Sequence, residues 1–264
     1  MAAIEPMNQF MIHKVVDLPK IRVHGVGALD MSITNSVLYM LIAATLITVF
    51  FLAASRRAVV PGRMQALAET LYDLVDNGLT GAMIGDKVRP FLPFIFTLFS
   101  LIAVMNIVGL FPLQFTVTSQ LAVTVTLALL TFVSVVVIGF LRNGLGFFKL
   151  FVPSGVSIFM AMFLAPIEFI SFMVRPVTLS MRLFGNMIGG HVVMYMFASF
   201  VVGLGLFASH GGLASLGFAG SALSMFMVVA LMALEFIVAF LQAFVFAALT
   251  CTYINDVVNL GHGH

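Results

Sequence analysis

The sequence predicts an all-α protein that crosses a membrane several times. Of its 264 residues, 62% are hydrophobic and only 8% are Asp, Glu, Lys or Arg, whereas about a quarter of the residues in a soluble domain are charged. The mean hydropathy is +1.18, and apolar residues form runs of about 20, the length of helix that spans a bilayer. We expect one membrane domain over residues 34–256, with extramembrane tails at 1–33 and 257–264.

The N-terminal part of the chain changes character at residue 34. Residues 1–33 mix charged and apolar side chains, so we expect an extramembrane tail that ends in a short helix or turn. Residues 34–54 are almost wholly apolar and are followed by Arg56 and Arg57. They are predicted to form the first crossing helix.

Residues 65–79 are predicted to form a different kind of helix. One face carries apolar residues at helical spacing, namely Leu67, Leu71, Leu74 and Val75. The acidic residues Glu69, Asp73 and Asp76 fall off that face. Such an amphipathic helix lies in the membrane interface and does not cross it.

Four further crossing helices are predicted, at about 90–112, 119–141, 154–202 and 222–254. Asn106 is the main polar residue inside the first of these four. As a helix, the third would be on the order of 70 Å long, more than twice the hydrocarbon thickness of about 30 Å. It must therefore be strongly tilted, bent or divided. A Gly- and Ser-rich link at 203–221 precedes the last helix.

The distribution of Lys and Arg predicts the orientation in the membrane. The segments 55–89 and 142–149 contain basic residues, whereas the links 111–119 and 203–221 contain none. Because cytoplasmic loops are enriched in Lys and Arg, the first two should lie inside. This places the N-terminus outside and the C-terminus inside, with five crossings. A second crossing within 154–202 would put the uncharged 203–221 link inside, which the same rule disfavours.

Several functional classes are excluded. A single cysteine, Cys251, leaves no internal disulfide and no cysteine-based metal cluster. No nucleotide-binding, hydrolase or metalloprotease motif is present, so we expect no catalytic site, cofactor or metal in this chain. The net charge is +2, and most of the basic residues lie in short loops. This distribution indicates membrane topology and not nucleic-acid binding. The N-terminus has neither signal-peptide nor transit-peptide character.

Five ionisable residues fall within the last two long helices: Glu168, Arg175, Arg182, His191 and Glu235. An ionised side chain at the bilayer centre costs about 2.5 to 3.5 kcal/mol on insertion scales and usually faces a bundle interior or a water-filled path. Glu168, Arg175 and Arg182 recur every seven residues and form one stripe, because two helical turns cover about seven residues. His191 follows Arg182 by nine positions and points to the opposite side.

Uncharged polar residues extend this pattern. Asn186 follows Arg182 by one helical turn, and Gln242 follows Glu235 by seven residues on the last helix. Two polar stripes on two long helices indicate a route for ions or protons.

Structural explanations compete for most of these residues. Arg175, next to a proline, could place its guanidinium at an interface, and Glu168 could be its structural partner. Asn186 and Gln242 are also typical of hydrogen bonds between helices. For Arg182 the alternative is a buried ion pair, although carboxylates are scarce around it in sequence. His210 and Asp256 are expected to be solvated.

The segment RPVTLSMRLFGNM at residues 175–187 resembles subunit a of the rotary F-type ATP synthase, a family defined by an arginine followed by Leu-Phe-Gly-Asn. MNIVGLFP at 105–112 resembles the family's second span. Glu168 stands fourteen residues before Arg182, and Gln242 occupies the matching position on the last helix. The resemblance covers residues 34–256.

The pair His191 and Glu235 resembles a variant within this family. Many bacterial members carry Glu nine residues after the arginine and His seven residues before the glutamine. Here the two residue types are exchanged, as in mitochondrial and related bacterial members. The exchange suggests that the two side chains lie close together and share one function.

The resemblance implies a non-catalytic stator subunit that couples proton translocation to rotation of a c-subunit ring and to ATP synthesis. Arg182 would face the ring between two proton half-channels. His191, Glu235 and Asn186 would belong to the outer half-channel and Glu168 to the inner one. Gln242 would also line the proton pathway, with Arg175 as an anchor or channel edge.

The implied partners are the c-subunit ring, the peripheral-stalk b subunits, the rest of the complex, the lipid bilayer and the translocated protons. The last two helices would be strongly tilted along the ring, whose own ion site decides between protons and sodium. We expect the bacterial inner membrane, with the mitochondrial inner membrane as the alternative.

A self-contained ion channel or secondary transporter is the competing function. Such transporters usually contain internal repeats and broken helices, and the sequence shows no repeat.

Overall fold

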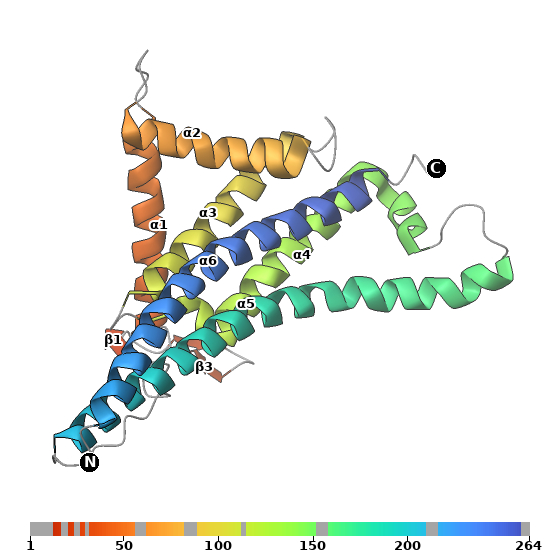
Figure 1. Ribbon diagram of the computed structural model, residues 1–264. Coiled ribbons are helices and arrows are strands. Elements are labelled where there is room, and N and C mark those ends of the chain that lie inside the picture. Colours follow the sequence, from red (N-terminus) through yellow and green to blue (C-terminus); the bar gives the residue numbers. More distant parts are fainter. Residues whose placement is uncertain are drawn as a thin grey trace. The chain divides into compact units, whose positions relative to one another are not determined.

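A computed structural model describes residues 13–16, 21–23, 27–29, 32–55, 62–81, 89–111, 115–151, 158–209 and 216–259 (Figure 1). Its α-helices are α1 (Asn35–Ala54), α2 (Arg63–Val75), α3 (Leu92–Gly109), α4 (Leu121–Asn143), α5 (Ile158–Ala208) and α6 (Leu216–Val258). Within these ranges five helices are long and apolar enough to cross a membrane, namely α1, α3, α4, α5 and α6. The predicted all-α, polytopic fold class is therefore confirmed.

Helix α2 is the helix predicted to lie in the interface. Three apolar side chains on it are exposed, with Met64 at 54%, Leu67 at 52% and Leu74 at 36%. Val75 at its end is buried, and a π-helical turn, η2 (Asp76–Gly81), continues the chain. Exposed apolar side chains on a helix that also carries acidic residues suit a membrane interface.

Short 3-10 turns border the next two helices. They are η3 (Arg89–Phe91) before α3, η4 (Val117–Ser119) before α4 and η5 (Gly144–Phe151) after α4. Gly144 has a φ of +53°, a conformation that favours glycine, and it ends α4. Helix α4 thus covers 121–143, against the predicted 119–141.

Helices α5 and α6 are longer than predicted, with 51 and 43 residues. Residues 203–208 and 216–221, expected to belong to the link, are helical. In an apolar setting a helix satisfies its own backbone hydrogen bonds, so glycine and serine do not end it. Pro166 and Pro176 also lie within one continuous α5. Residues 154–157 and His210 lie outside the described residues.

The small residues of the predicted link pack the two helix ends together. Ser221 Oγ donates a hydrogen bond to the Val201 carbonyl oxygen at 2.9 Å. A Cβ atom on Gly217 would lie 2.8 Å from the Leu204 carbonyl oxygen, so only glycine permits this approach. The Gly- and Ser-rich composition therefore serves helix packing.

The described part of the N-terminal tail contains strands and shows no helix at the end of the tail, whereas residues 30–31, next to the last strand, lie outside the described residues. Strand β1 (Lys14–Val16) pairs with β4 (Ile33–Thr34), and β2 (Ile21–Val23) pairs with β3 (Gly27–Leu29), both antiparallel. The Asn35 backbone N–H donates to the His13 carbonyl at 3.0 Å. Several of the paired residues are β-branched, which favours strands. Residues 1–12 and 260–264 lie outside the described residues.

The chain forms two compact units, each of which brings together distant segments. One unit comprises residues 1–44, 104–120 and 184–241. The other comprises residues 45–103, 121–183 and 242–264. Each unit has its own buried residues, for example Met105, Met187 and Ala239 in the first.

The second unit is held by aromatic and small residues. The rings of Phe147, Phe151 and Phe172 lie 5.6 to 6.1 Å apart between centroids. Asn143 Nδ2 donates to the Val257 carbonyl at 2.7 Å and joins α4 to α6. A Cβ atom on Gly139 would come within 2.6 Å of Val257 and of the Phe147 ring. These contacts fix the C-terminal part of α6 within this unit.

Candidate functional site

His191 and Glu235 form a buried pair between α5 and α6 in the first unit. His191 Nε2 lies 3.6 Å from Glu235 Oε1. The two residues are only 1% and 6% exposed. The predicted proximity of these side chains is confirmed, while their role stays a prediction.

A third side chain, Thr116, completes this cluster. Its Oγ1 lies 2.9 Å from His191 Nε2 and also donates a hydrogen bond to the Gly109 carbonyl at 3.0 Å. Thr116 belongs to the segment between α3 and α4, and its residue is 1% exposed. The sequence alone did not indicate a role for Thr116. Its signal would have been the hydroxyl-rich run Thr116, Thr118 and Ser119 in a link without charge.

Two residues, Gly190 on α5 and Asn106 on α3, let α6 pack closely around the pair. Gly190 lies beside Glu235, and a Cβ atom there would be 2.7 Å from Oε1 and 2.9 Å from Cδ. Asn106 on α3 is fully buried and donates from Nδ2 to the Ala239 carbonyl at 3.0 Å. Ala239 follows Glu235 by one helical turn. The polar residue noted in the second span therefore ties α3 to the turn of α6 that follows Glu235.

Arg175 is at the centre of a second cluster, in the other unit. Its Nη1 donates to Asp256 Oδ2 at 3.0 Å, and its Nη2 lies 3.9 Å from Glu168 Oε1. The guanidinium carbon lies 4.7 Å from the ring centre of Tyr253, within cation–π range. Arg175 is thus half-buried against α6, with Asp256 as its closest carboxylate and Glu168 at the limit of ion-pair distance.

The expectation that Asp256 is solvated was wrong. Helix α6 continues to Val258, so Asp256 stands within a helix and its side chain is 33% exposed. Its pairing with Arg175 spans 81 residues of sequence. No local pattern could have indicated this partner.

Arg182 lies on the exposed surface of α5. Within the described part of its own unit, no carboxylate forms an ion pair with it, so the alternative of a buried ion pair is not observed there. Apolar side chains surround it along the helix, with Val177 57% and Met181 53% exposed. The chain thus presents a fixed cation on an apolar surface.

The remaining predicted residues differ in exposure. Asn186 is exposed on α5, and Gln242 on α6 is 4% exposed. The side chain of Glu168 is 38% exposed. Within the described ranges, no three His, Cys, Asp or Glu side chains are grouped so that they could hold a metal ion.

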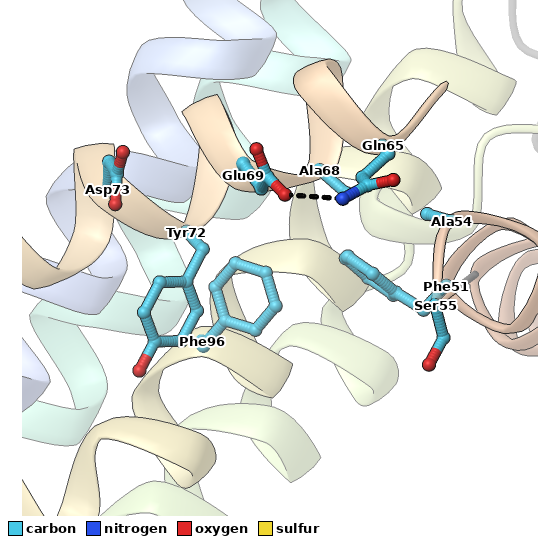
Figure 2. Close-up of a pocket in the computed structure, with 9 residues that line it drawn as sticks. All are labelled: Phe51, Ala54, Ser55, Gln65, Ala68, Glu69, Tyr72, Asp73 and Phe96. Carbon is cyan, nitrogen blue, oxygen red and sulfur yellow. Dashed lines mark hydrogen bonds between the residues drawn. The ribbon is translucent and has the colours of Figure 1, made fainter. Parts of the chain in front are cut away.

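A pocket of about 600 Å³ lies in the second unit, between α1, α2 and α3 (Figure 2). Gln65 Nε2 donates to Glu69 Oε1 at 2.8 Å along its α2 side. The ring of Phe96 contacts those of Phe51 and Tyr72, with centroids 5.2 and 5.5 Å apart. The pocket shares no residue with the predicted proton pathway. The candidate functional residues are therefore the buried pair in the first unit and, in the second unit, the Arg175 cluster and the exposed Arg182.

This arrangement has two chemical capabilities. An imidazole and a carboxylate within 4 Å can exchange a proton after a small movement. A guanidinium keeps its charge at any physiological pH and can hold an anionic group of another molecule against α5.

Comparisons with known proteins identify the family of this chain. The ATP synthase A chain family model matches residues 37–255. ATP synthase subunit a of Mesorhizobium japonicum is 46% identical over 260 residues, which cover 98% of each chain. The subunit a proteins of Rhodopseudomonas palustris (strain HaA2) and Nitrobacter hamburgensis are 46% and 44% identical, with 98% of this chain and all of theirs covered. The chain therefore belongs to the ATP synthase A chain family.

Proposed function

We propose that this chain is the stator subunit a of an F-type ATP synthase and that it couples proton translocation to rotation of a c-subunit ring. Family membership supports assembly into an ATP synthase complex. The single observation that carries the finer proposal is Arg182, an exposed guanidinium on an apolar helix surface.

Exposure of the Arg182 guanidinium to lipid costs free energy, so it requires a negatively charged partner. An arginine facing lipid is unfavourable by at least about 2.5 to 3.5 kcal/mol at mid-membrane. Its own unit offers no carboxylate to it among the described residues. A ring of c subunits, each with a carboxylate in the membrane, would supply the missing negative charge one subunit at a time.

The charge of Arg182 has two consequences beside such a ring. It favours loss of the proton from an arriving carboxylate, because the ionised form pairs with the guanidinium. It also repels protons and so prevents leakage between the two half-channels. Each charge that crosses 100 mV contributes about 2.3 kcal/mol, so several protons are needed for each ATP formed.

The buried pair is assigned to the outer half-channel. His191 and Glu235 offer a base and an acid side by side, and Asn186 belongs to the same path. Glu168 is assigned to the inner half-channel, and Gln242 also belongs to the proton pathway. Arg175 is the anchor at its edge, held by Asp256 and Tyr253.

The chain is placed in the bacterial inner membrane as a multi-pass protein. The named relatives are bacterial proteins, and the described residues include five apolar helices of sufficient length. We propose the N-terminus outside and the C-terminus inside, from the positions of Lys and Arg. The long α5 and α6 would be tilted along the ring, and the b subunits of the peripheral stalk would bind elsewhere on the chain.

Purification and reconstitution test this proposal against a self-contained channel. The chain should co-purify with a c ring and a head that hydrolyses ATP. In liposomes, the purified chain alone should conduct no protons, whereas the membrane sector that contains the ring should conduct them. Proton or sodium flux through the chain alone would contradict the stator proposal.

A further inference from the structure

The contacts of Thr116 determine which nitrogen of His191 carries a proton. A threonine hydroxyl has one proton to donate, and a carbonyl oxygen can only accept. The bond from Thr116 Oγ1 to the Gly109 carbonyl therefore uses the hydroxyl proton. With the proton used in this way, the Thr116 oxygen is the acceptor in its 2.9 Å contact with His191 Nε2, and both contacts are satisfied at once. The neutral imidazole is then protonated on Nε2 and has its lone pair on Nδ1.

Glu235 competes with Thr116 for the same proton. Its Oε1 is 3.6 Å from His191 Nε2, longer than a hydrogen bond. Both carboxylate oxygens are buried, and neither accepts a hydrogen bond from the residues that the structure describes. The Nε2–H group thus donates its hydrogen bond to Thr116. It also lies next to the Glu235 carboxylate, which can accept the proton.

The backbone around Thr116 is fixed. Ser119 Oγ donates to the Thr116 carbonyl at 2.6 Å, and the Ser119 backbone N–H reaches the same oxygen at 3.3 Å. A Cβ atom on Gly109 would lie 2.7 Å from Thr116 Cγ2, so glycine at this position lets the segment pack against the end of α3. The hydroxyl is therefore held in place by the fold.

We propose that Thr116 is a positioning residue of the proton pathway, which sets the tautomer of His191 and holds its Nε2–H group for transfer to Glu235. This inference rests on the proposed function, in which His191 and Glu235 pass protons.

The transfer consists of two proton movements. An incoming proton binds the Nδ1 lone pair of neutral His191 and forms an imidazolium. The Nε2–H bond then breaks as a Glu235 oxygen takes that proton, which leaves a neutral imidazole protonated on Nδ1 and a neutral carboxylic acid. One proton has entered and one has moved on, and no electrons are exchanged.

A hydroxyl suits this step because it can both accept and donate. Once Nε2 has lost its proton, the Thr116 hydroxyl can turn from the Gly109 carbonyl and donate to Nε2. When Nε2 takes up a proton again and Nδ1 releases its own, both original bonds return and the ring is back in the starting tautomer. A methyl group in place of the hydroxyl would permit neither arrangement.

Three variants in the assembled ATP synthase test this role. Thr116→Val removes the hydroxyl at constant shape and should slow ATP-driven proton pumping about tenfold, as expected for loss of one buried hydrogen bond to a group that becomes charged. Thr116→Ser keeps the hydroxyl and should pump at close to the wild-type rate. Thr118→Val is the matched control, since Thr118 is fully buried in the same segment and its hydroxyl bonds to none of the described residues.

A spectroscopic measurement separates positioning from packing. Solid-state 15N NMR of the complex with labelled histidine, with the His191 signal identified by its loss in His191→Gln, should show the neutral ring protonated on Nε2 in the wild type and in Thr116→Ser. Thr116→Val should shift it toward the Nδ1–H form. This measurement on the wild type stands even where Thr116→Val does not assemble.

Specific outcomes would overturn the inference. One is a wild-type His191 imidazole that is protonated on Nδ1. The others are normal pumping by Thr116→Val, an equal loss of pumping in Thr118→Val, or pumping in Thr116→Ser as slow as in Thr116→Val. Normal pumping by Arg182→Ala would instead contradict the proposed function. Loss of pumping in Arg182→Ala together with normal pumping in Thr116→Val would overturn only the role of Thr116.

Discussion

His191 Nε2 and Glu235 Oε1 lie 3.6 Å apart, although the two residues come from different helices and are separated by 44 positions. If they share one function, exchanging them should be better tolerated than changing either alone. The double variant His191→Glu with Glu235→His should therefore retain more ATP-driven pumping than each single variant. The rate of acidification of inverted membrane vesicles gives the comparison, and equal loss in all three variants would argue against a shared site.

Gly190 should be required for the position of Glu235. In Gly190→Ala the new Cβ atom would lie 2.7 Å from Oε1 and 2.9 Å from Cδ of Glu235, so the carboxylate must move away from His191. We expect pumping to fall several-fold although alanine favours the helix by up to about 1 kcal/mol.

Gly203 provides the control for this change. It lies on the same helix, and a Cβ atom there would meet nothing within 4 Å. Gly203→Ala should pump at the wild-type rate. An equal effect of both substitutions would show that helix flexibility, and not the position of Glu235, is responsible.

The contact between Arg175 and Asp256 should stabilise the chain. Their side chains are 22% and 33% exposed, so each change, Arg175→Gln or Asp256→Asn, should reduce the free energy of unfolding by about 1 to 3 kcal/mol. The double variant should lose less than the sum of the two, because the partner of each is already absent.

Thermal unfolding of the purified membrane sector measures these differences. Asp73→Asn is the matched control, because Asp73 is an exposed carboxylate on α2. It should leave the midpoint unchanged. Additive losses in the double variant would show that the contact contributes nothing to stability.

The helices could be predicted because each is specified locally. A run of about 20 apolar residues can only be a spanning helix, and the amphipathic spacing in α2 distinguishes it from its neighbours. The end of α5 was placed too early and the start of α6 too late, because Gly203, Gly205 and Gly217 looked like turn residues. In an apolar environment such residues permit close packing while the helix continues.

Contacts across long sequence separations could be predicted only where a second clue existed. The exchanged residue types indicated that His191 and Glu235 meet. No such clue linked Thr116 to His191, 75 residues away, or Arg175 to Asp256. The strands of the tail were missed because segments of two or three residues carry too little periodicity to be distinguished from turns.

ATP-driven proton pumping by assembled complexes that carry Arg182→Ala tests the central claim most directly. Arg142→Ala is the control, because Arg142 is also an exposed arginine, at the end of α4 beside the Phe91 ring. With ATP hydrolysis by the head retained in both, Arg182→Ala should abolish pumping to background and Arg142→Ala should leave it intact. Normal coupled pumping by Arg182→Ala would contradict the account.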